Sequence, residues 1–192
     1  MPEGDEGLWA PHYTCGQHCG QEGTLASLSG GRILCVLRTR QGHPFYSVSA
    51  DKGATWSKPE MLRYSPGGEP LWQPCAPCPI QKLRDGRFVL LFHNAQPLDI
   101  KENGWYPRDP MWVTVAREAP GVQENAGLYF TAPKVILYND RKPDGPFKDT
   151  EICYPQFYEF GDACYVAYAN KTSQIRINKV PPELIDDVGL PI

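Results

Sequence analysis

Four cysteines have spacings that would suit a metal ion. Cys15 and Cys19 in CGQHCGQE are separated by three residues, and Cys75 and Cys78 in CAPC are separated by two. Both spacings occur in zinc sites, where four thiolates, or three and a histidine, hold the ion. Both segments also precede runs of strand-forming residues, where small side chains suit crowded packing. We favour the packing role and expect no metal and no cofactor.

The remaining cysteines point to buried thiols. The chain has seven cysteines, an odd number, so they cannot all pair in disulfides within it. Cys35 and Cys164 lie in the apolar runs ILCVL and ACYVAY, where a small buried thiol is the usual interpretation.

The octapeptide SADKGATW, residues 49–56, joins a run of β-forming residues to a polar segment. In this pattern Asp51 can accept hydrogen bonds from turn amides, and Gly53 supplies a residue with positive φ. Ser49 and Thr55 can cap backbone groups, and the Trp56 ring can pack on the strands. The octapeptide therefore predicts a hairpin turn, a structural role and not a catalytic one.

The segments that must position any site have sequences typical of β-strands. Helical periodicity never persists for three turns, whereas short runs of Val, Ile, Leu, Phe and Tyr alternate with Gly, Pro, Asn and Asp clusters. The chain is therefore expected to be all-β. The expected strands are 23–28, 32–39, 44–50, 87–93, 111–117, 128–137, 154–160, 163–170 and 174–180.

Three segments repeat one pattern of strand, tight glycine turn and more apolar strand. They are TLASLSGGRILCVLR, PIQKLRDGRFVLLFHN and YPQFYEFGDACYVAYAN, and each continues into a third strand. Units of roughly four strands, repeated radially, are the blades of a β-propeller. We expect one incomplete propeller domain over 1–192, with blades at about 20–62, 75–138 and 150–182. Since three blades do not close a ring, we expect a fragment or a chain that needs partner copies.

The charge pattern of the chain limits the classes of partner that it can bind. The formal net charge is −3, with both signs interspersed, so neither a basic surface for nucleic acid nor a polybasic tract for membranes is present. The start MPEGDEGLWAPHY lacks the basic and apolar regions of a secretion signal, and the compartment stays open. We expect a small-molecule or glycan partner, no nucleic acid, no membrane, and self-association through exposed blade faces.

With these features in view, the chain resembles the sialidase-like propellers with BNR repeats, a six-bladed family that includes exo-α-sialidases. SADKGATW matches the Asp box of that family at all five fixed positions, Ser49, Asp51, Gly53, Thr55 and Trp56. The resemblance continues in QEGTLASLSGGRILCVLR, in YPRDPMWVTVARE and in ICYPQFYEFGDACYVAYANK. It implies a glycoside hydrolase that removes terminal sialic acid or a related acidic sugar.

The resemblance also assigns site residues. It makes Tyr154 the catalytic nucleophile and Glu22 the carboxylate that assists it, and it places Arg38 and Arg108 in a grip on the substrate carboxylate. A carboxylate on the anomeric carbon suits guanidinium groups and would repel a carboxylate nucleophile. A phenol ionises about three units above neutral pH, so a base must take its proton during the attack.

Two departures from the family pattern limit what the chain can do alone. No Arg precedes Arg32, and the only acidic residues ahead of Glu22 are Glu3, Asp5 and Glu6, so the family's first Arg and its acid/base Asp have no counterpart. We therefore expect the isolated chain to be inactive or nearly so. Pro155 also follows Tyr154 where sialidases commonly have Ser, which weakens the substrate assignment.

Several structural alternatives remain open. Tyr154 could be a strand aromatic packed between blades, and Glu22 and Arg38 could be a surface ion pair. Arg40, Arg87 and Arg117 compete with Arg108. The whole protein could be a non-catalytic carbohydrate-binding or scaffold propeller, and a different glycosidase or a lyase comes third.

Overall fold

A computed structural model describes residues 21–95, 108–139, 152–170, 174–188 and 190. Within these ranges all extended elements are β-strands, and the helical turns are short 3-10 segments, so the all-β expectation is confirmed. None of the described helices is long and apolar enough to cross a membrane.

The strands form three antiparallel sheets. The first sheet has the order β1-β2-β3-β4, with β1 (Gln21–Ser27), β2 (Ile33–Arg38), β3 (Phe45–Ser49) and β4 (Glu60–Met61). The second has the order β5-β6-β7-β8, with β9 also on β7; these are β5 (Ile80–Lys82), β6 (Phe88–Phe92), β7 (Met111–Glu118), β8 (Leu128–Phe130) and β9 (Lys134–Leu137). The third has the order β10-β11-β12, with β10 (Ile152–Phe160), β11 (Ala163–Asn170) and β12 (Gln174–Val180).

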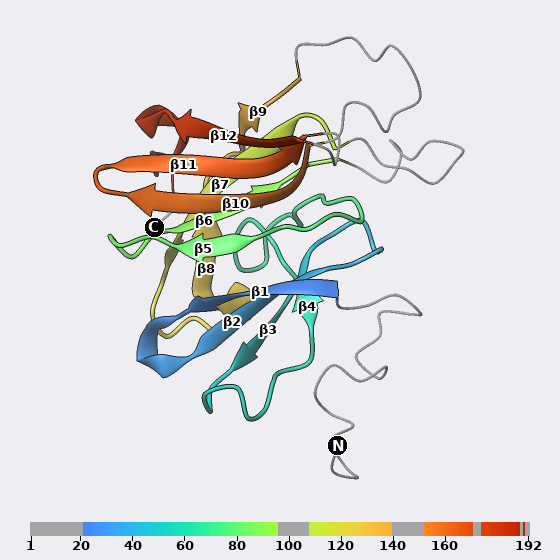
Figure 1. The fold of residues 1–192 in the computed structure, drawn as a ribbon. Coiled ribbons are helices and arrows are strands. Elements are labelled where there is room, and N and C mark those ends of the chain that lie inside the picture. Colours follow the sequence, from blue (N-terminus) through green and yellow to red (C-terminus); the bar gives the residue numbers. More distant parts are fainter. Residues whose placement is uncertain (1–20, 96–107, 140–151, 171–173, 189, 191–192) are drawn as a thin grey trace.

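The second sheet lies between the other two, as Figure 1 shows with β1–β3 below it and β10–β12 above it. Its strands are apolar on both faces, because successive side chains of a strand point to opposite faces of the sheet. Phe88, Leu90 and Phe92 pack toward the first sheet in one core cluster. Val89 and Leu91 pack toward the third sheet in the other. This stacking of sheets face to face is how neighbouring blades of a propeller pack.

The first sheet has the four strands expected for a blade, whereas the second sheet has five. The predicted strand 128–137 is interrupted, because the Thr131 hydroxyl accepts a hydrogen bond from Val115 N–H at 3.1 Å, and Thr114 Oγ1 donates to the Thr131 carbonyl at 2.8 Å. β8 and β9 therefore pair with different parts of β7. The third sheet has three described strands. The division of the chain into blades of one domain stays a prediction.

The octapeptide 49–56 forms the turn between β3 and β4. Asp51 accepts hydrogen bonds from Ser49 Oγ, Thr55 N–H and Thr55 Oγ1, all within 2.8 Å, and Ser49 Oγ also accepts one from Gly53 N–H at 2.8 Å. Gly53 has φ +91°, as the sequence predicts. The hydrogen bonds from Thr55 and then Ser49 lower the pKa of Asp51 to about 2. The network is local, so this segment holds the hairpin together.

Candidate functional site

Glu22 and Arg38 meet at one end of the first sheet. The register pairs Gln21, the residue before Glu22, with Arg38 at the end of β2. The Glu22 and Arg38 side chains therefore lie at the same end of the sheet. Arg38 Nη1 donates to Glu22 Oε2 at 2.6 Å; the Arg38 side chain is 14% exposed and the Glu22 side chain is 41% exposed. The structure thus brings together two of the four predicted site residues.

Arg108 approaches the same place from the segment before β7. Its Nη2 donates to the carbonyl oxygen of Cys75 at 3.1 Å, and its Nη1 lies 3.3 Å from Cys153 Sγ. Arg38 Nε lies 3.4 Å from Cys75 Sγ. Cys75 therefore touches both guanidinium groups, and we call Arg38 and Arg108 the arginine pair.

Tyr154 lies on β10, immediately after Cys153. Cys153 is buried against Arg108, whereas Tyr154 is 52% exposed. The alternative in which Tyr154 packs between sheets therefore loses support. Among the described residues the Tyr154 hydroxyl has no hydrogen-bond partner, and the Glu22 carboxylate is engaged by Arg38 instead. The expected hydrogen bond between Tyr154 and Glu22 is thus not formed in this structure.

Both residues predicted to be catalytic have unusual backbones. Glu22 has φ +46° and Tyr154 has φ +50°, in the left-handed region that non-glycine residues seldom occupy. Each lies in an interruption of the strand register, between Gln21 and Thr24 on β1 and between Cys153 and Gln156 on β10. Such bulges redirect side chains and are common beside active sites, where backbone strain also concentrates.

The arginine pair places two guanidinium groups at this end of the sheets. Burial alone would lower the pKa of Arg38, but its hydrogen bonds to Glu22 and Cys75 outweigh this effect and raise the pKa above its usual value. His93 is 3% exposed, and burial first, with Arg108 second, lowers its pKa to about 3, so it is neutral. The guanidinium groups of Arg38 and Arg108 and the carboxylate of Glu22 therefore lie close together at this end of the sheets.

Two of the competing arginines lie elsewhere. Arg87 pairs with Asp85 beside the turn before β6, at 2.6 Å. Arg117 pairs with Asp187 near the far end of β7 from Arg108. Arg40 has no ion pair among the described residues. Arg108 is thus the arginine that reaches Cys75 together with Arg38.

The residues that connect the arginine pair are not predicted from the sequence. Cys75 and Cys78 were considered only as zinc ligands or packing residues; the described residues contain no metal-ligand cluster, and Cys15 and Cys19 lie outside the described ranges. Gln73, with no exposed surface, holds the segment that carries Cys75: its Nε2 donates to the Ala76 carbonyl at 2.9 Å, and its Oε1 accepts from His93 N–H at 2.8 Å. A glutamine in an apolar stretch was the signal that could have identified it.

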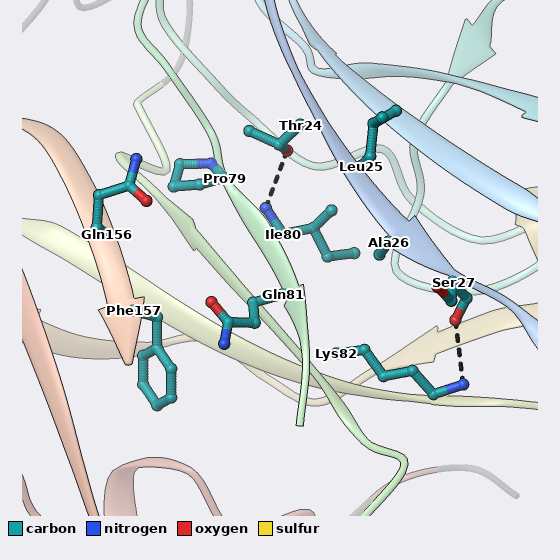
Figure 2. A pocket seen from close by; sticks show the side chains of 10 residues that line it. All are labelled: Thr24, Leu25, Ala26, Ser27, Pro79, Ile80, Gln81, Lys82, Gln156 and Phe157. Carbon is teal, nitrogen blue, oxygen red and sulfur yellow. Dashed lines mark hydrogen bonds between the residues drawn. The ribbon is translucent and has the colours of Figure 1, made fainter. Parts of the chain in front are cut away.

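A pocket lies beside the candidate site, along the first strand of each of the three sheets. It has a volume of about 450 Å³ and lies between β1, β5 and β10 (Figure 2). Thr24 and Gln156 line it, two residues after Glu22 and Tyr154 respectively. Gln81 and Gln156 flank it with side-chain amides that make no hydrogen bond to another described residue. The pocket therefore offers polar groups to a ligand.

Comparisons with known proteins reveal the fold but no close relative. The chain matches no family model and no curated protein. Solved structures do resemble it. The leech intramolecular trans-sialidase, complexed with 2,7-anhydro-Neu5Ac, has a TM-score of 0.59 and 14% identity over 85% of this chain and 24% of that chain. The intramolecular trans-sialidase of Ruminococcus gnavus, in complex with oseltamivir carboxylate, has a TM-score of 0.56 and 14% identity over 86% and 34%.

A GH43B protein of the Bacteroides ovatus xyloglucan PUL has a TM-score of 0.50 and 16% identity over 82% of this chain and 25% of that chain. At these identities the likeness shows the fold alone. The chain spans about a quarter to a third of the length of these three proteins. Its fold is sialidase-like, of the kind found in glycoside hydrolases.

Proposed function

We propose that this chain carries part of the site of an exo-acting glycoside hydrolase of sialidase type, which removes terminal sialic acid or a related acidic sugar. The observation that carries the proposal is the convergence of Arg38 and Arg108 on Cys75, beside Glu22 and next to the strained Tyr154. Two sialidase structures with the same fold hold 2,7-anhydro-Neu5Ac and oseltamivir carboxylate, which supports an acidic sugar as the ligand.

In the proposed reaction the arginine pair holds the sugar carboxylate, and the Cys75 and Cys153 groups give way to it as hydrogen-bond acceptors. A carboxylate is a far stronger acceptor for guanidinium than a thiol or a neutral carbonyl. Tyr154 attacks the anomeric carbon while Glu22 takes the phenolic proton, and water then releases the sugar from the tyrosine with retention. The acid that protonates the leaving group and a third arginine belong, in this proposal, to blades beyond those described, in a six-bladed ring.

The competing proposal is a propeller that binds acidic sugars without reacting. It is favoured by the ion pair of Glu22 with Arg38, which occupies the proposed base, and by the absence of a described partner for the Tyr154 hydroxyl. The arginine pair serves both proposals, so binding and turnover must be measured separately.

The test compares N-acetylneuraminate with its methyl ester in titration calorimetry on this chain. Because a charge-assisted hydrogen bond is worth about 1.5–3 kcal/mol, the free acid should bind at least about tenfold more tightly than the ester. Equal affinities would overturn the assignment of the arginine pair. Release of a fluorophore from a sialoside by the full-length protein would then favour the enzyme, and binding without release would favour the binding protein.

We further propose that two copies of the chain associate through the outer face of the third sheet. This face is largely apolar. It comprises Tyr158, Phe160, Tyr165, Ala167, Ile175 and Ile177, together with the polar Gln156 and Lys179, which the strand register places on one side of β10–β12. Ile175 is 83% exposed and Phe160 is 78% exposed, whereas Phe157, Val166 and Tyr168 on the opposite side of β10 and β11 are buried in the core. An apolar sheet face of this kind usually has a partner.

The expected result is concentration-dependent dimerisation in sedimentation velocity, abolished by Ile177→Lys, which places a charge within the face. Leu25→Lys is the control, because Leu25 is 61% exposed on β1 of the first sheet, outside the proposed contact face. A monomer at all concentrations would contradict the proposal, as would a dimer that survives Ile177→Lys.

A further inference from the structure

The pocket beside the candidate site is lined by residues from all three sheets. Its volume of about 450 Å³ lies within the usual range of small-molecule sites, about 300–1,000 Å³. The lining residues are 24–27 of β1, 79–82 on and just before β5, and 156–157 of β10 (Figure 2). A ligand in this pocket would therefore contact three sheets at once.

Several polar side chains of the pocket keep unused hydrogen-bonding capacity. The Gln81 and Gln156 amides make no hydrogen bond to another described residue, and Figure 2 shows both beside the pocket. Thr24 Oγ1 accepts a hydrogen bond from Ile80 N–H at 3.1 Å, so its own hydroxyl proton stays available to a ligand. Each amide offers an oxygen that accepts and an NH2 group that donates. The pocket therefore presents donors and acceptors together.

The charge of the lining argues against an ion as the ligand. None of the ten described residues that line the pocket is acidic, so no carboxylate is there to hold a cation. Lys82 is the single charged residue among them. Its ammonium donates to the Ser27 carbonyl at 3.0 Å and lies 5.2 Å from the centre of the Phe88 ring, so the protein itself holds it. A neutral ligand that carries hydroxyl groups suits this lining.

We propose that this pocket binds a neutral sugar, of the size of one hexopyranose. Each hydroxyl of a pyranose ring both donates and accepts, so one side-chain amide can accept from one hydroxyl and donate to its neighbour. Gln81 and Gln156 do this from two different sheets, and Thr24 donates from a third. The arginine pair takes no part in this site, so the inference goes beyond the proposed function and does not rest on it.

The test titrates the methyl glycosides of galactose, glucose and mannose into the 15N-labelled chain and follows the binding by NMR. The side-chain amide signals of Gln81 and Gln156, assigned with Gln81→Met and Gln156→Met, report the site directly. We expect at least one of the three sugars to shift both signals and to saturate at millimolar concentration. No shift with any of the sugars would overturn the proposal, as would a shift with inorganic phosphate and none with the sugars.

The same variants measure what the amides contribute. Gln81→Met and Gln156→Met keep the approximate volume of the side chain, and each should weaken the binding of that sugar at least about fivefold, the loss expected for one neutral hydrogen bond. Gln123→Met is the matched control, because Gln123 is exposed and precedes the 3-10 turn Glu124–Gly127, outside the pocket. Affinities in both pocket variants equal to that of the control would overturn the role of the amides.

A further variant separates the pocket from the proposed contact between copies, because Gln156 also belongs to that face. Ile177 does not line the pocket, so Ile177→Lys should retain sugar binding. Loss of binding in Ile177→Lys would assign the shifts to the contact between copies and overturn the pocket as the site.

The outcome separates from that of the proposed function. Binding of a neutral sugar without binding of N-acetylneuraminate removes only the sialidase proposal. Binding of N-acetylneuraminate, with no response of either amide to the neutral sugars, removes only the pocket.

Discussion

Replacing Tyr154 with phenylalanine is expected to lower the hydrolysis of a fluorogenic sialoside by the full-length protein about a thousandfold or more. The change removes only the hydroxyl that would form the bond to the anomeric carbon. Loss of a nucleophile, or of the proton transfer coupled to it, costs factors of this size or larger. The measurement is kcat and KM for release of the fluorophore, and the effect should fall on kcat.

The structure supplies a matched control for this experiment. Tyr158 lies on the same strand, and Tyr154 and Tyr158 are both 52% exposed. Because neither phenol is buried, neither substitution should alter the thermal unfolding temperature by more than a degree or two. Tyr158→Phe should leave hydrolysis unchanged. Hydrolysis that survives Tyr154→Phe, or falls equally in both variants, would exclude Tyr154 as the nucleophile.

The backbone around Tyr154 strengthens the expectation. A non-glycine residue in the left-handed region costs about 1–3 kcal/mol, and the structure holds both Glu22 and Tyr154 there. At Glu22 the neighbouring bulge residue is Gly23, where a Cβ atom would lie 2.9 Å from Cys35 Sγ. Two strained residues near the starts of β1 and β10, the first strands of two sheets, are hard to explain by packing alone, since neither side chain is buried. A functional role for their orientation accounts for both.

Much of the fold could be predicted from the sequence because its signals are local. Glycine turns at Gly31, Gly86 and Gly161 all have positive φ, and the apolar runs between them became strands within a few residues of the expected bounds. β4 and β5, with two and three residues, are too short to carry an alternating pattern. The break between β8 and β9 depends on the Thr131 hydroxyl and its neighbours across the sheet, which no pattern along the chain reveals.

The candidate site, too, could be predicted only in part from the sequence. The contact of Glu22 with Arg38 follows from one hairpin, so the sequence could anticipate it. The contacts of Cys75 with both arginines join three segments, 22–38, 73–78 and 108, whose approach depends on how the sheets stack. The positive φ values at Glu22 and Tyr154 had no signal either, because the usual residues for that conformation are glycine and asparagine.

Gln73 is the residue whose loss should connect stability with the site. Gln73→Met keeps the approximate volume of the side chain but removes its hydrogen bonds to the Ala76 carbonyl and from His93 N–H, both in the buried interior. A buried donor left without an acceptor costs about 1–3 kcal/mol, and the lost acceptor contact adds to this. We expect the free energy of unfolding, measured with urea, to fall by about 3 kcal/mol.

Gln156→Met is the control, because the Gln156 amide borders the pocket and makes no hydrogen bond to a described residue (Figure 2). Its effect should stay within about 0.5 kcal/mol. Since Gln73 fixes the segment that presents Cys75 to Arg38 and Arg108, Gln73→Met should also weaken the binding of N-acetylneuraminate while the chain remains folded. If Gln73→Met costs no more than Gln156→Met, the 73–78 segment is held by backbone packing, and the position of Cys75 at the arginine pair does not depend on the glutamine.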